Sequence, residues 1–95
     1  MKELPENMNV YKRTPEYNEE TIPAGLLKAH TTKEGTWGKI CISKGKLIYI
    51  IETQPQETIE LTPNKYGVVE PQVPHHVKPS GKVEFHVEFL SSAES

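Results

Sequence analysis

The chain has 95 residues, a formal net charge of -2 and one cysteine, and these properties limit what it can be. Ninety-five residues are enough for one domain with a single modest core. Acidic and basic residues are interspersed, so no basic stripe is available for nucleic acid, and the longest apolar run, residues 47–51, is far too short to cross a membrane. The N-terminus lacks an apolar leader and Cys41 cannot form an internal disulfide, which together predict a cytoplasmic protein.

Short strands separated by turn residues follow one another along the chain. Residues 1–23 are polar and contain three prolines, so we expect an N-terminal arm that lies over the sheet or over a partner subunit. No window of eleven residues or more sustains the apolar period of a helix. Residues 24–95 are therefore predicted to form one β domain. Including one strand in the arm, the predicted strands are residues 9–14, 25–31, 36–43, 46–53, 58–62, 66–70, 75–78 and 82–90.

Turn residues separate these strands at four places: Lys44-Gly45, Gln54-Pro55-Gln56, Pro63-Asn64 and Ser80-Gly81. Strands that recur about every ten residues are typical of a sandwich, barrel or jelly roll. We expect an all-β, single-domain β-barrel of jelly-roll type with essentially no helix. Such a small barrel leaves sheet edges that need cover, which predicts a homodimer. A sedimentation mass near 10.8 kDa at high concentration would contradict the dimer.

The Ser80-Gly81 turn decides where the histidines lie. If these residues form a two-residue hairpin loop, His75 is directly opposite His86, with Cβ atoms about 4.5–5.5 Å apart. Glu88 then lies on the same face, and two histidines with a carboxylate are metal-ligand types. If Gly81 forms a bulge instead, the loop gains one residue and His75 moves to the face of the apolar residues of the last strand.

Each candidate also has a structural alternative. Histidines in strands are usually solvated or hydrogen-bonded. His76 is adjacent to His75 and points to the opposite face, where solvent is expected. Glu88 lies between two apolar residues, so it needs a metal ion, a cationic partner or an outward-facing position. Cys41 is predicted to be a small buried apolar side chain in its strand.

Four separated blocks of sequence resemble, in order and position, the TehB/YeaR-like family of small cupin domains. They are HTTKEGTWG at residues 30–38, GKLIY at 45–49, EPQVPHHV at 70–77 and VEF at 87–89. The resemblance covers nearly the whole chain and implies a single metal-binding cupin barrel. Members are small stand-alone proteins or N-terminal segments of tellurite-resistance methyltransferases, and their activity is poorly defined. They are linked to tellurite or nitrosative stress.

The resemblance also implies a ligand set, although the match is incomplete. A full first cupin motif carries two histidines and a glutamate, whereas here only His30 is present and Thr32 stands where a second histidine would be expected. The implied metal ligands are therefore His30 and His75, completed by His86 or Glu88. Three protein ligands leave open positions for water or a small ligand around a divalent ion such as zinc, iron, nickel or manganese.

Two functional classes follow from this site. In the first, the chain is a metal-dependent enzyme whose ion polarises a bound oxygen or orients a small oxyanion. In the second, it is a binding or sensing domain for a small polar or anionic ligand. A third alternative is a protein-interaction barrel without metal. The sequence contains no nucleophile triad, phosphate-binding loop or methyltransferase segment, which favours binding over a named reaction.

Overall fold

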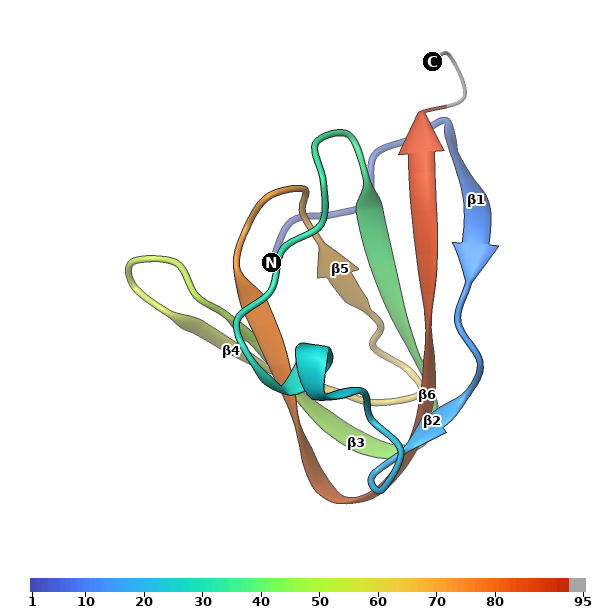
Figure 1. Ribbon diagram of the computed structural model, residues 1–95, viewed down its shortest axis with the longest axis vertical. Coiled ribbons are helices and arrows are strands. Elements are labelled where there is room, and N and C mark those ends of the chain that lie inside the picture. Colours follow the sequence, from blue (N-terminus) through green and yellow to red (C-terminus); the bar gives the residue numbers. More distant parts are fainter. Residues whose placement is uncertain (93–95) are drawn as a thin grey trace.

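The computed structural model describes residues 1–92 and consists almost entirely of antiparallel β-structure (Figure 1). Its strands are β1 Met8–Arg13, β2 Tyr17–Asn18, β3 Trp37–Ile51, β4 Glu57–Leu61, β5 Gly67–Val69 and β6 His75–Ser92. Among the described residues, the helical structure is a 3₁₀ turn, η1, at Ala24–Leu27. No helix in this part of the chain has the length and apolar character needed to span a membrane. The predicted all-β class is confirmed.

Two long strands, β3 and β6, form the centre of the sheet. They pair from Trp37 opposite Leu90 to Ile51 opposite His75, and their register shifts twice within residues 42–47. Such bulges increase the local twist and bend of a sheet. Both strands bend at this point, and the sheet turns back on itself like a V (Figure 1). The first limb contains the N-terminal half of β3 and the C-terminal half of β6, and the second limb contains the other two halves.

The four short strands extend these limbs. β1 and β2 pair with the C-terminal half of β6, β5 pairs with the N-terminal half of β3, and β4 pairs with the C-terminal half of β3. The strand order β1-β6-β3-β4 ends at two different edges, so the sheet formed by residues 1–92 is open. The predicted β-barrel is therefore not closed, and the jelly-roll topology stays a prediction. Because the sheet folds over at its bend, it covers its own apolar face although its edge strands do not pair to form a barrel.

Two of the predicted turns lie inside strands. Gly45 and Gly81 both have a positive φ, of 78° and 86°, which glycine adopts without strain. Neither glycine reverses the chain, because β3 and β6 stay paired with each other on both sides of it. The strands predicted before and after each glycine are single bent strands, and the predicted hairpin at Ser80-Gly81 is wrong.

The N-terminal part of the chain also differs from the prediction. The expected arm, residues 1–23, supplies β1 and β2 at the edge of the same sheet. The strand expected at residues 25–31 is replaced by η1 and by an isolated bridge between His30 and His75. Leu26 of η1 packs against the core, which explains why an apolar segment can be buried here without forming a strand. The homodimer stays a prediction.

The core lies between the two limbs. Along β3 and β6, alternate side chains point into the V, so that residues of both limbs meet. The buried cluster contains Ile22, Ile40, Ile42, Leu47, Tyr49, Ile51, Leu61, Val69, Val77, Val83, Phe85 and Val87. The intervening residues form the outer face of the sheet.

Substituting the glycine at the bend of β3 tests how strongly the fold depends on this geometry. In Gly45→Ala, the new Cβ would overlap the carbonyl oxygen of Lys82 and the residue would keep an unfavourable positive φ. We expect the free energy of unfolding to fall by about 3 kcal/mol or more in urea denaturation. Gly81→Ala is the matched control, because its φ is similar but no atom lies within 4 Å of the added Cβ. In this control the free energy of unfolding should fall by about 1–2 kcal/mol. Equal decreases in the two variants would contradict the role of the close approach between Gly45 and Lys82.

Candidate functional site

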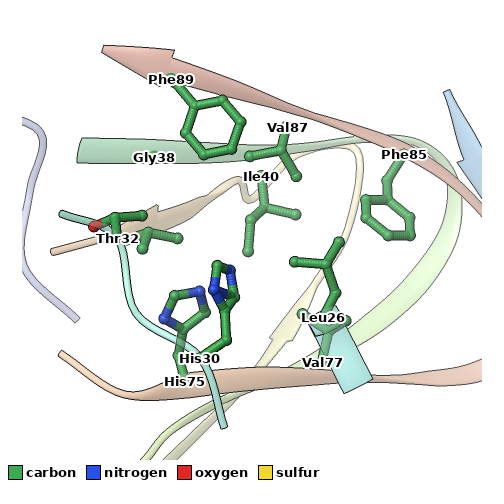
Figure 2. Close-up of a pocket in the computed structure, with 11 residues that line it drawn as sticks. Leu26, His30, Thr32, Gly38, Ile40, His75, Val77, Phe85, Val87 and Phe89 are labelled. Atoms are coloured by element: carbon green, nitrogen blue, oxygen red, sulfur yellow. The ribbon is translucent and has the colours of Figure 1, made fainter. Parts of the chain in front are cut away.

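A small pocket between the two limbs contains two of the predicted metal ligands. Its polar lining residues are His30, Thr32 and His75, and Figure 2 shows both imidazoles projecting side by side into it. The other lining residues are apolar: Leu26, Gly38, Ile40, Val69, Val77, Phe85, Val87 and Phe89. The cavity volume is about 20 Å³, which is room for one water molecule or one ion. An organic substrate does not fit inside this inner pocket.

Backbone pairing places the two histidines next to each other. The His30 N–H donates to the His75 carbonyl oxygen and the His75 N–H donates to the His30 carbonyl oxygen, each over 3.0 Å. His30 thereby adds one residue to the edge of β6, directly beside its first residue. The two ring centroids are 4.7 Å apart. The pair therefore depends on the backbone, and the side chains are held on the inner face.

The surroundings of His75 fix its protonation. The residue is 4% exposed, and burial lowers the pKa of its imidazole below the usual 6.5, against the opposing effect of a hydrogen bond to Val73. That bond joins Nδ1 to the Val73 carbonyl oxygen over 3.0 Å, so Nδ1 must carry the proton. A neutral ring protonated at Nδ1 has an unprotonated Nε2. The second nitrogen is thus available as a hydrogen-bond acceptor or a metal ligand.

The neighbouring hydroxyl groups are already engaged. Thr32 is buried and donates its hydroxyl proton to the Thr36 carbonyl oxygen over 2.8 Å. The Tyr49 ring contacts His75 edge-on, with centroids 5.9 Å apart, but its hydroxyl donates to the Val68 carbonyl oxygen. Burial raises the pKa of that hydroxyl, so Tyr49 stays protonated. The two imidazoles are therefore the groups of this pocket that can bind an ion.

A wider, open vestibule adjoins the inner pocket. It has a volume of about 510 Å³ and shares Leu26, His30, Val87 and Phe89 with the inner pocket. Its remaining lining comes from the N-terminal region and includes the cations Lys12 and Arg13. A small ligand can therefore reach His30 from the vestibule, past a positively charged rim. Sequence reasoning missed these residues, because the pairing of β1 with β6 that brings them here is long-range.

The other two predicted ligands lie on the opposite face of the sheet. His75, Phe85 and Val87 point inward from β6, whereas His86 and Glu88 occupy alternate positions and point outward. His75 is paired with Ile51 and not with His86. The four residues predicted as one metal site are thus separated into two pairs by β6. His75 shares the apolar face of the strand, as the bulge alternative predicted.

Three further residues can be compared with their predictions. His76 faces away from His75 as expected, but its Nδ1 lies 2.8 Å from a carboxylate oxygen of Glu52. Glu88 has both an outward position and a cationic partner, Arg13, at 2.7 Å. Cys41 was predicted to be buried, and this is wrong. It lies half-exposed on the outer face, because the inward positions beside it are occupied by isoleucines.

The low pKa of His75 predicts a pH effect on stability. Above the unfolded-state pKa of about 6.5, the ring is neutral in both the folded and the unfolded state, so protonation of His75 does not reduce the stability of the fold. As the pH falls below that value, the unfolded chain binds a proton before the folded chain does, so the stability falls by up to about 1.4 kcal/mol per pH unit. We expect chelator-treated wild-type protein to lose more stability between pH 7 and pH 5 than His75→Gln. Urea denaturation across this range measures both slopes, and identical slopes would contradict the assignment.

Comparisons with known proteins agree with this architecture. The family model of the TehB-like domain matches residues 12–87. The probable S-adenosyl-L-methionine-dependent methyltransferase TehB of Haemophilus influenzae strain Rd is 36% identical over 72 residues, which cover 72% of this chain and 25% of TehB. The uncharacterized protein YeaR of Escherichia coli K12 is 22% identical over an alignment of 103 residues, covering 99% of this chain and 87% of YeaR.

Two crystal structures have the same fold. That of Haemophilus influenzae TehB superposes with a TM-score of 0.82 at 30% identity, covering 92% of this chain and 32% of TehB. That of a protein from Escherichia coli K12 superposes with a TM-score of 0.84 at 22% identity, covering 97% of this chain and 98% of that protein. This chain spans about a quarter of the length of TehB, so the methyltransferase name of the whole protein does not transfer to it. The family predicted from the sequence is confirmed: the chain belongs to the TehB-like domain family.

Proposed function

We propose that this protein binds a small polar or anionic ligand at a divalent metal ion, with His30 and His75 as the protein ligands of that ion. The observation that carries the proposal is the state of His75. Its buried, neutral ring donates from Nδ1 to a backbone carbonyl group and has Nε2 free beside a second imidazole. Histidine ligands of metal ions almost always have this second hydrogen bond, which fixes the tautomer and orients the ring.

The size and chemistry of the inner pocket fit a single ion. A cavity of about 20 Å³ holds one ion or water, and imidazole nitrogen suits zinc, iron and nickel. Two protein ligands leave the remaining coordination positions to water or to a ligand that arrives through the vestibule. When bound, a divalent cation supplies a Lewis-acidic centre that attracts anions. Lys12, which is paired with the inward-facing Phe89, adds a positive charge at the rim that also favours an anionic ligand.

Binding or sensing fits the pocket better than a reaction. Among the residues that line the inner pocket, the titratable groups are the two imidazoles, and both are assigned to the ion. No separate acid or base of this lining could therefore transfer a proton to a substrate. The relationship to TehB makes tellurite and chemically similar oxyanions the first ligands to test. We keep the cytoplasm as the proposed location, since Cys41 is unpaired.

Removing one imidazole should abolish metal binding in the inner pocket. The measurement is calorimetric titration with Zn²⁺ and Ni²⁺ in a Cys41→Ser background, which removes the thiol as a competing ligand. We expect His75→Ala to lose the binding event, because one remaining imidazole cannot hold the ion. His76→Ala is the matched control, since His76 is the next residue but faces the outer side. Equal binding in both variants would exclude His75 as a ligand.

Small oxyanions should bind at the loaded site. Co²⁺ replaces the native ion in this experiment, because its visible spectrum reports changes in the coordination shell. We expect nitrite, selenite or tellurite to change the spectrum of the Cys41→Ser protein and of its His76→Ala variant, but not of its His75→Ala variant. If no anion changes the spectrum and a short peptide or oligonucleotide binds at micromolar concentration, the protein is an interaction domain instead.

A further inference from the structure

Three metal-ligating side chains lie together on the outer face of the sheet, behind the inner pocket. Cys41 of β3 is directly opposite His86 of β6, and Glu88 is two residues further along the same face of β6. The Cys41 Sγ atom, a His86 ring nitrogen and a Glu88 carboxylate oxygen all lie within 4.8 Å of one another. The strand register brings these residues together, so the cluster follows from the backbone pairing.

We propose that Cys41, His86 and Glu88 form a second metal site, which binds a thiophilic divalent cation such as Zn²⁺. A thiolate, an imidazole and a carboxylate are all zinc ligands, and three protein ligands leave the fourth tetrahedral position to water. The thiolate gives this site a softer ligand set than that of the inner pocket, which favours zinc over manganese or magnesium. The two sites are on opposite sides of β6 and do not share a ligand.

The present distances are close to those that a zinc ion requires. Zinc bond lengths place neighbouring ligand atoms of a tetrahedral site about 3.3–3.6 Å apart. The His86 Nε2 atom and the Glu88 Oε2 atom are already 3.1 Å apart, and they are joined by a hydrogen bond. The cluster therefore needs a movement of about 1 Å by the Cys41 side chain or the His86–Glu88 pair, which side-chain rotation supplies without a change in the strands.

Arg13 supports the carboxylate of this cluster. Its Nη2 atom donates to Glu88 Oε2 over 2.7 Å, and the Glu88 side chain is only 12% exposed. This is the oxygen that also lies beside His86, so an ion can share it with the guanidinium group or take Oε1, and in both cases Arg13 orients the carboxylate. The nearby ammonium group of Lys39 is directed elsewhere, since its Nζ lies 4.6 Å from the centre of the Tyr66 ring.

The Cys41 thiol loses its proton when a cation binds to Sγ. Burial and the negative charge of Glu88 raise the pKa of Cys41, so without a cation the group is a protonated and weakly reactive thiol. A bound divalent cation reverses this preference and releases the proton to solvent. The bond that forms is between the ion and Sγ, and no oxidant or reductant is needed.

Cobalt titration of the full chain under reducing conditions tests this proposal. Thiolate coordination to Co²⁺ gives a charge-transfer band in the near ultraviolet, which imidazole and carboxylate ligands do not give. We expect this band in wild-type protein and its removal by excess Zn²⁺, because both proposed sites can take up zinc. In His86→Ala the affinity measured from the band should fall by more than about 100-fold, since even the loss of an orienting group costs about 10–100-fold.

The control variants separate this site from the inner pocket. His76→Ala removes a histidine from the same outer face but outside the cluster, and it should keep the wild-type affinity within about twofold. His75→Ala should also keep the band, whatever the outcome for the inner pocket. Glu88→Gln preserves the shape of the side chain and should weaken binding at least tenfold. This variant replaces His86→Ala in the test if circular dichroism shows that His86→Ala does not fold. Absence of the band in wild-type protein, or unchanged affinity in the ligand variant that folds, would overturn the proposal.

Discussion

β3 and β6 stay paired through the bend of the sheet, and every other strand attaches to one half of one of them. At the bend, Gly45 approaches the Lys82 carbonyl oxygen so closely that a side chain would overlap it. Because the two strands bend together, their apolar faces meet and form the core. The inner pocket, the position of His75 and the separation of the outer cluster all follow from this one paired, bent unit.

The same alternation of side chains gives the two faces different chemistry. Inside the V, His75 is almost fully buried among apolar residues and its imidazole is neutral. Outside, Glu88 is charged and accepts hydrogen bonds from His86 and Arg13, with the half-exposed Cys41 nearby. The two proposed metal sites would therefore differ in their ligands: two imidazoles inside, and a thiol, an imidazole and a carboxylate outside.

Local sequence features were sufficient for the all-β class, for most strand segments and for locating an irregularity at Gly45 and Gly81. They could not show that these glycines bend paired strands, because a turn and a bulge use the same local chemistry and differ only in the partner strand. The predicted hairpin wrongly placed His75 opposite His86, whereas the true strand register pairs His75 with Ile51. The pair of His30 with His75 came from the family resemblance, and the contribution of Arg13 could not be foreseen because its partner Glu88 is 75 residues away.

The inner pocket lies between two limbs that meet at the glycines, so the angle of the bend sets its width. A cavity of about 20 Å³ is close to the smallest space that admits a water molecule. A slight opening of the angle would therefore let in a second molecule, and a slight closing would leave room for none. Gly45 and Gly81 do not line the inner pocket, yet the backbone geometry at these two positions influences its size.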